Sequence, residues 1–230
     1  ESEPEPEPDP EPEPDPDAVT ANYNTINTPG EDANIVKAFV AADVDTTKFD
    51  FPAYKLTPDG EGAGNYERKF QFDVNISKVG SIQDKTAIVI PVDTTSAPSF
   101  TMHTPWKLGD DGQWFRPKID EKVSFLDMDG NLSEIKIGVV NTANVGLGKK
   151  GYLIIPFDVL EVDSGTGDGV FDVDTFKSFQ MHAYKDNSKA LTNGPVYIGQ
   201  VGLVTDIAAF IENPDITPEP DPDAVTANYN

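Results

Sequence analysis

The sequence predicts an all-β fold of the β-sandwich class. Short segments with alternating or continuous apolar residues recur along residues 18–213, and turns rich in Gly, Pro, Asn and Asp separate them. No segment places apolar residues at the i, i+3, i+4, i+7 spacing of an amphipathic helix over a dozen positions. Many short strands separated by such turns are typical of two packed antiparallel sheets.

Proline and acidic residues alternate at the start of the chain. Residues 1–17 read ESEPEPEPDPEPEPDPD, with nine carboxylates and no basic residue. Proline fixes φ and removes amide donors, and the repeated like charges extend the chain further, so we expect a semi-rigid polyproline II spacer. A disordered acidic tail is a compatible alternative. The predicted folded domain therefore spans residues 18–213.

Inside this domain the apolar patterns predict strands in a regular succession. The predicted strands span residues 66–76, 86–92, 121–128, 132–140, 150–157, 178–184 and 195–204. The letters DGN at 129–131 predict a hairpin turn between the third and fourth of these strands. Residues 35–41 (IVKAFVA) suit either a strand or a helix, and residues 206–213 (DIAAFIEN) suit one or two helical turns.

Three of these stretches resemble a known class of domain. They are VSFLDMDGN (123–131), KKGYLIIPFDVL (149–160) and GPVYIGQVGLVTD (194–206). In this order they are similar to the jelly-roll, galactose-binding-like carbohydrate-binding modules of secreted bacterial polysaccharide-degrading systems. The resemblance implies a jelly-roll sandwich that binds a glycan such as starch, xylan, glucan or mannan. The linked layout also resembles cell-surface starch-adherence proteins of Gram-positive gut bacteria.

One position departs from the pattern of that family. In the family an Asp often follows the letters VYI of the last strand, and this chain has Gly199 there. A metal or ligand role for this position is therefore not expected.

The charge and the composition exclude several classes of function. The net charge is -23, and the chain has no cysteine. An acidic domain repels phosphate backbones and anionic lipids, so we expect neither nucleic acid nor a membrane surface as a partner. The absence of cysteine excludes disulfides, thiolate zinc sites and a cysteine nucleophile. No apolar run approaches the roughly 18 residues that span a bilayer, so membrane insertion is not expected.

The segment TMHTPWKLGDDGQWFRPK (101–118) has the composition of a sugar-binding surface. Sugars stack their C–H faces on flat aromatic rings, while charged and polar groups hold their hydroxyls. A hairpin around GDDG would bring the two tryptophans close together across the strands, as a platform for successive sugar rings. Core packing of one or both indoles is an alternative of equal weight. The candidates are Trp106, Trp114, His103, Lys107 and Arg116.

A second group of candidates lies near the end of the predicted strand 178–184. The period of two places Phe179 and Met181 on one face, and Gln180, His182 and Tyr184 on the other. The second face is the more polar one, and it suits a glycan on a jelly-roll surface.

Two acidic stretches suggest calcium as a structural ion. Hard oxygen ligands in a flexible, Gly-rich loop suit Ca²⁺, and related modules often hold one, although the spacing in DSGTGDGVFDVD (163–174) matches no defined calcium motif. In DMDGN (127–131) the hairpin interpretation is favoured over a calcium loop, since the Glu expected later in such a loop is missing. No other cofactor is expected. The candidate calcium ligands are Asp163, Asp168, Asp172 and Asp174.

The sequence favours binding over catalysis. It contains two histidines, and it lacks the GxSxG, HExxH and phosphate-binding glycine motifs. We expect a non-catalytic carbohydrate-binding module, extracellular or on a bacterial cell surface, that tethers a protein to starch or another plant glycan. A structural or adhesive spacer module is the first alternative, and a small jelly-roll glycosidase is the second.

A thirteen-residue sequence occurs twice. PEPDPDAVTANYN occupies residues 12–24 and returns unchanged at residues 218–230. The simplest explanation is a tandem array, in which residues 214–230 hold the next spacer and the beginning of a following module. An array of weak sites would bind a repeating polymer through avidity.

Overall fold

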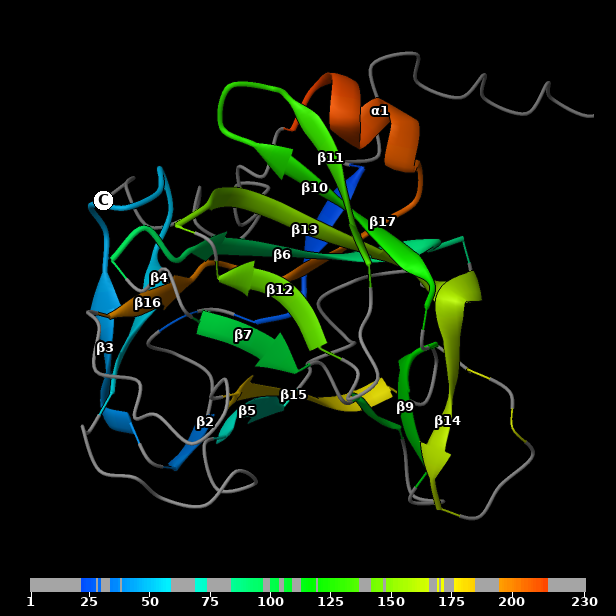
Figure 1. The fold of residues 1–230 in the computed structure, drawn as a ribbon, viewed down its shortest axis with the longest axis horizontal. Coiled ribbons are helices and arrows are strands. Elements are labelled where there is room, and N and C mark those ends of the chain that lie inside the picture. Colours follow the sequence, from blue (N-terminus) through cyan, green and yellow to red (C-terminus); the bar gives the residue numbers. More distant parts are fainter. Residues whose placement is uncertain are drawn as a thin grey trace, which may run out of the picture.

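In the computed structural model the described part of the chain is a sandwich of two antiparallel sheets, which confirms the predicted fold class (Figure 1). The predicted spacer and residues 215–230 lie outside this part. The described residues are 22–27, 29, 34–37, 39–58, 69–73, 84–96, 100–103, 106–108, 113–118, 120–136, 142–146, 148–165, 169, 171, 176–184 and 195–214.

Sheet A contains nine of the described strands. Their order is β11-β10-β13-β6-β16-β4-β3, and β17 pairs with β6 and with the edge strand β1. The bounds are β1 (Tyr23–Thr25), β3 (Phe39–Asp45), β4 (Ala53–Pro58), β6 (Ala87–Asp93), β10 (Lys122–Asp127), β11 (Leu132–Lys136), β13 (Lys150–Pro156), β16 (Val196–Ile198) and β17 (Gly202–Val204).

Sheet B contains eight of the described strands. Their order is β12-β7-β15-β8-β9-β14, with β5 on the other edge of β15 and β2 beyond β5. The bounds are β2 (Asn34–Lys37), β5 (Lys69–Asp73), β7 (Phe100–His103), β8 (Trp106–Leu108), β9 (Trp114–Pro117), β12 (Thr142–Gly146), β14 (Leu160–Ser164) and β15 (Phe176–Tyr184). A short 3-10 helix, Phe157–Val159, connects β13 to β14.

The structure confirms the predicted strands where it describes them and corrects one. The ambiguous stretch 35–41 belongs to two strands, β2 and β3. The predicted strand 195–204 is broken into β16 and β17, because the chain leaves the sheet between them: β16 pairs with β4 and β6, and β17 pairs with β6 and β1. The helical turns predicted near the end are α1 (Ile207–Glu212), which begins where Asp206 accepts a hydrogen bond from the Ala209 N–H at 3.0 Å.

Strand β6 explains why its sequence is a continuous apolar run. Every residue of β6 is buried, because the centre of sheet A is covered on both faces. One face packs against sheet B, and the other lies beneath α1, which sits above sheet A in Figure 1. A strand covered on one face only would alternate apolar and polar residues.

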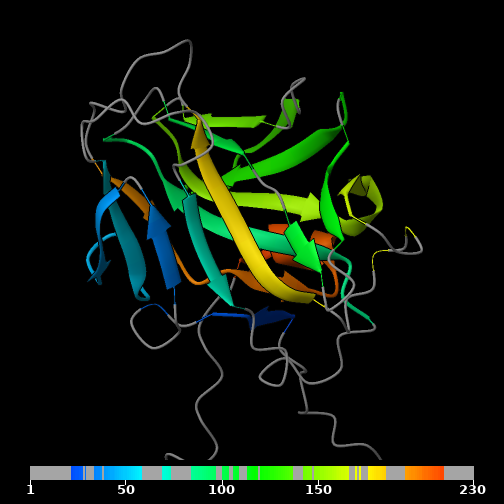
Figure 2. The same ribbon diagram turned by 90° about the horizontal axis from the view of Figure 1, so that it is seen from below.

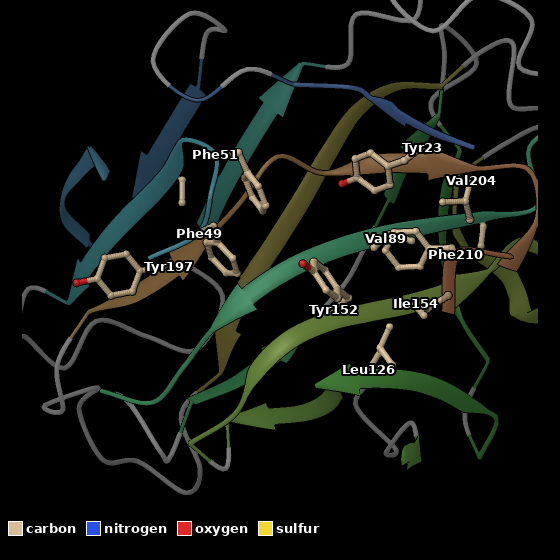
Figure 3. Packing of buried hydrophobic residues seen from close by; sticks show 12 residues of the cluster. Tyr23, Phe49, Phe51, Val89, Leu126, Tyr152, Ile154, Tyr197, Val204 and Phe210 are labelled. Atoms are coloured by element: carbon tan, nitrogen blue, oxygen red, sulfur yellow. The ribbon is translucent and has the colours of Figure 1, made fainter. Parts of the chain in front are cut away.

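The second buried face of sheet A carries an aromatic cluster (Figure 3). Phe210, the buried residue of α1, lies over the sheet next to Tyr23 and Tyr152, with ring centroids at 5.7 and 5.6 Å. Phe49 and Phe51 stack on each other at 5.0 Å and extend the cluster along the sheet. This layer attaches α1 and the edge strand β1 to the body of the sandwich.

The hairpin turn predicted at DGN is confirmed. Strands β10 and β11 pair through five registered residues, from Lys122 opposite Lys136 to Leu126 opposite Leu132. Asp127 closes the turn, since its Oδ1 accepts hydrogen bonds from the backbone N–H groups of Asn131 at 2.8 Å and Asp129 at 2.9 Å. Its carboxylate therefore serves the turn, as an Asx-type interaction does.

We expect Asp127→Ala to weaken this hairpin in a pH-dependent way. The Asn131 backbone and side-chain hydrogen bonds hold the pKa of Asp127 below its usual value. A group with a lowered folded-state pKa stabilises the fold above its unfolded pKa, near 4, and this contribution is lost as the pH falls through the folded-state pKa. The stability difference between wild type and Asp127→Ala, measured by urea unfolding, should therefore shrink between neutral pH and about pH 3.

Asp129→Ala is the matched control for this experiment. It removes an exposed carboxylate from the same turn but keeps the backbone N–H of residue 129, which donates a hydrogen bond to Asp127. Its effect on stability should be small at every pH. A difference between wild type and Asp127→Ala that stays constant with pH would contradict the assignment.

Within the described ranges, α1 included, no helix is both long and apolar enough to cross a bilayer.

Candidate functional site

Sheet B has one face turned toward sheet A and one turned away from it. On β9 the residues alternate: Phe115 and Pro117 are buried, while Trp114 and Arg116 are partly exposed. The ring of Phe115 contacts that of Phe171 at 5.4 Å in the interior. The alternate positions along β9 that hold Trp114 and Arg116 therefore define the outer face of sheet B. Figure 2 shows this sheet from below, with β15 crossing its middle in front of sheet A.

Strand β15 contributes three of the predicted site residues to the outer face. His182 lies opposite His103 of β7, and Tyr184 lies opposite Thr101 of the same strand. Directly opposite residues of an antiparallel pair share a face, and so do residues two apart along one strand. Gln180, His182, Tyr184 and His103 thus occupy neighbouring positions on one face, as the period of two predicts for β15.

The β8–β9 hairpin continues the same face on the other half of β15. Lys107 lies between Ser178 of β15 and Trp114 of β9 in the register. Arg116 is two residues beyond Trp114, and its Nη2 lies 3.3 Å from Oε1 of Glu161 on β14. The side chains of this ion pair are 23% and 39% exposed, so the pair lies partly open to solvent.

Trp106 occupies the opposite face from the other candidates. It lies opposite Phe179 of β15 and Phe115 of β9, which belong to the inner face. The predicted hairpin exists, but its register pairs Trp106 with Phe115 and not with Trp114. A shift of one residue in register moves a residue to the other face, so the expected platform of two neighbouring indoles does not form on one face.

Strand β5 adds polar positions that sequence reasoning does not select. Lys69 lies opposite His182, Gln71 opposite Gln180, and Asp73 opposite Ser178. The signal is present in the sequence, because the alternation of residues 66–76 puts these three positions on the face opposite to Phe70 and Phe72. A search for stacking residues favours tryptophan, and β5 contains none.

The outer face of sheet B is wide enough to hold an oligomer. Strands β2, β5, β15, β8, β9 and β14 follow one another across it, and five spacings of about 4.8 Å give a width of roughly 24 Å. The residue types at the positions of this face include a partly exposed indole and amide, hydroxyl, imidazole, ammonium and guanidinium groups. Such a mixture can stack on a sugar ring and hydrogen-bond its hydroxyls.

Asp73 of β5 and Glu161 of β14 lie too far apart on this face to form a pair for glycoside hydrolysis. Four strand spacings of about 4.8 Å separate their strands, roughly 19 Å in all. The two carboxyl groups of inverting or retaining glycosidases lie about 5–9.5 Å apart. Glu161 is also held in the ion pair with Arg116.

A groove lies between the β10–β11 hairpin and the beginning of β13. It has a volume of about 370 Å³, and Phe125, Asp127, Ser133 and Lys149 are among its lining residues. Phe125 is 1% exposed and is covered by the Lys149 ammonium at 5.2 Å, while the Asp127 carboxylate serves the turn. The groove therefore offers no aromatic surface for stacking.

The predicted calcium ligands are only partly within the described residues. Asp163 lies in β14, whereas Asp168, Asp172 and Asp174 lie outside the described residues. The part that is described contains no group of three or more acidic or histidine side chains arranged for a metal ion. Calcium at this loop stays a prediction.

The structure gives a physical reason for the glycine at position 199. A Cβ on Gly199 would lie 2.4 Å from Cε2 of Phe51 and 2.8 Å from Cβ of Pro91. The Gly199 N–H donates to the carbonyl of Pro91 at 2.9 Å. The Phe51 ring thus occupies the space that an Asp side chain would need.

Comparisons with known proteins identify similar solved structures. A family 11 carbohydrate-binding module from Clostridium thermocellum, in complex with a β-1,3-1,4-mixed-linked tetrasaccharide, is 12% identical and matches with a TM-score of 0.45 over 80% of this chain and 97% of that chain. The family 11 module of a cellulosomal cellulase from the same organism is 12% identical, with a TM-score of 0.40 over 79% of this chain and 94% of that chain. No protein-family model matches the sequence, and no curated protein matches it.

Proposed function

We propose that this chain is a non-catalytic carbohydrate-binding module whose glycan lies on the outer face of sheet B. In this proposal Trp114 stacks on a sugar ring, and Arg116, Lys107, Gln180, His103, His182 and Tyr184 bond to sugar hydroxyls. The module tethers a secreted or cell-surface bacterial protein to a polysaccharide, such as starch or another plant glycan.

The observation that supports this proposal is the register of sheet B. The proposed binding residues come from four strands, β7, β8, β9 and β15, and lie as far apart in the sequence as His103 and Tyr184. The strand pairing brings their positions to one face of the sheet. A partly exposed indole among polar and charged positions is the composition that stacks on sugar rings and bonds to their hydroxyls.

The proposal is tested by incubating the chain with insoluble starch, cellulose, xylan and mannan, and with soluble oligosaccharides that include a β-1,3-1,4-mixed-linked tetrasaccharide. We expect retention on at least one polymer and a shift of tryptophan fluorescence with the matching oligosaccharide. Failure to bind any glycan of the panel would contradict the proposal and favour the spacer. Release of reducing sugar would instead identify a glycosidase.

Arg116→Ala should weaken glycan binding without unfolding the protein. The guanidinium supplies several donors in a fixed geometry, and we expect about a tenfold loss of affinity in a calorimetric titration. The ion pair with Glu161 is partly exposed, so its loss alone should lower the free energy of unfolding by no more than about 1 kcal/mol.

Lys122→Ala is the control for the loss of an ion pair. Lys122 pairs with Glu134 on the β10–β11 hairpin of sheet A, where both side chains are well exposed. This variant should keep wild-type affinity and near wild-type stability. Equal losses of affinity in the two variants would show that Arg116 is not part of the binding surface.

A further inference from the structure

The edge strand β1 is held by the side chains of the sequence Asn22-Tyr23-Asn24. Its backbone pairs with β17, with Tyr23 opposite Val204 and Thr25 opposite Gly202. The other edge of β17 is already paired with β6, so β1 occupies the remaining edge.

Both asparagines bond to the body of the sandwich. Oδ1 of Asn22 accepts from the backbone N–H groups of Thr205 at 3.1 Å and Asp206 at 2.8 Å, and its Nδ2 donates to the Asp206 carbonyl at 2.7 Å. Oδ1 of Asn24 accepts a hydrogen bond from Nζ of Lys85. The amide groups therefore distinguish Asn from apolar residues at both positions.

Tyr23 fills a shaped site between them. Its ring is 6% exposed and stacks on Phe210 with an interplanar angle of 23°, and its hydroxyl donates to the carbonyl of Gln200. A Cβ on Gly202 would lie 2.4 Å from Cζ of Tyr23, so only glycine leaves room for the ring there. We call this site, formed by Lys85, Gln200, Gly202, Thr205, Asp206 and Phe210, the Tyr23 socket.

The chain contains a second segment that fits the same socket. Asn228-Tyr229-Asn230 repeats Asn22-Tyr23-Asn24, and the ten residues before each segment are also identical. Every side-chain contact just described can therefore be made by the second segment. The socket has no chemical means of distinguishing the two, and only their attachment to the fold differs.

We propose that the Tyr23 socket binds the segment Asn228–Asn230 of a second copy of this chain, which replaces β1 by strand exchange. Return of the segment to the socket of its own copy is the competing outcome, and the test below distinguishes the two. Such a contact is head-to-tail, so it joins copies into chains or rings rather than closed pairs.

The first segment has the advantage in the free wild-type protein. It continues directly into Ile26, whose N–H donates to the Val201 carbonyl at 2.8 Å, and this attachment gives it a high effective concentration at the socket. Exchange therefore requires that the first segment leave the socket or that copies be concentrated on a common polymer.

The test uses the full chain with Tyr23→Ala, with Tyr229→Ala, and with both substitutions. Analytical ultracentrifugation of Tyr23→Ala should show a mass that rises with protein concentration, because the vacated socket accepts Tyr229 of another copy. The double variant should stay monomeric, and Tyr229→Ala alone should match wild type. The proposal is wrong if Tyr23→Ala and the double variant behave alike. It is also wrong if Tyr23→Ala is monomeric yet more stable than the double variant, because the segment Asn228–Asn230 then fills the Tyr23 socket of the same copy.

A peptide provides a second measurement that does not depend on oligomers. A labelled peptide of residues 218–230 should bind Tyr23→Ala and raise its melting temperature. The melting-temperature measurement can be made even if that variant is only marginally folded. A peptide with Tyr229→Phe keeps the ring but loses the bond to Gln200, and it should bind about tenfold more weakly. A peptide that neither binds nor stabilises Tyr23→Ala would overturn the proposal.

Discussion

Phe210→Ala is expected to lower the free energy of unfolding by about 3–5 kcal/mol, the usual cost of truncating a buried phenylalanine. Phe210 is 1% exposed and is the buried residue through which α1 contacts sheet A. Its ring contacts Tyr23 and Tyr152, so its removal leaves a cavity beneath α1 and weakens the packing of β1 through Tyr23. Urea unfolding followed by circular dichroism measures the loss.

Glu212→Ala separates the effect of the ring from any change in the helix. Glu212 is exposed at the end of the same helix, and surface substitutions of this kind usually change stability by no more than about 0.5 kcal/mol. A loss of less than about 1 kcal/mol for Phe210→Ala would mean that α1 contributes little to the core. Sheet B is separated from α1 by sheet A, so glycan binding should persist in the folded fraction of this variant.

Trp114→Ala is expected to reduce glycan affinity by at least about tenfold, or 1.4 kcal/mol, because truncation of an aromatic anchor commonly costs this much or more. Trp114 is the partly exposed indole of the outer face of sheet B. The fold should be retained, since the residue lies outside the buried core. Titration calorimetry with the best oligosaccharide of the panel measures the change.

Two further variants distinguish a stacking role from a loss of apolar surface. Trp114→Phe keeps a ring and should recover part of the affinity. Leu132→Ala removes an exposed apolar residue of sheet A, 52% exposed, and should bind as wild type does. The fluorescence shift should disappear in Trp114→Phe if Trp114, and not Trp106, reports the ligand. Unchanged affinity in Trp114→Ala would remove this residue from the proposed site.

The elements that the sequence predicts best are those whose pattern has one physical meaning. The continuous apolar run of β6 specifies a strand covered on both faces, since burial on both faces selects apolar residues at every position. The alternation of β15 agrees with its register against β5 and β7. The same alternation is sufficient to place Gln180, His182 and Tyr184 together on one face of β15. The Asp and Gly residues of the β10–β11 turn specify that hairpin.

The features that sequence reasoning misses depend on register and on tertiary contacts. The letters GDDG mark a turn between the tryptophans but do not determine which residues lie opposite each other, so the separation of Trp106 from Trp114 could not be predicted. The close approach of the Phe51 ring to Gly199, beside the break between β16 and β17, comes from a segment far away in the sequence. The aromatic layer beneath α1 likewise joins distant residues.

The unequal covering of the two sheets has a consequence for how this domain can evolve. The centre of sheet A, at β6 and β13, is buried on both faces, so most substitutions there disturb packing and are selected against. The outer face of sheet B has no described element over it. Mutations can accumulate on that face at small cost in stability, so descendants of one ancestral scaffold can acquire new ligand preferences without first acquiring compensating changes elsewhere.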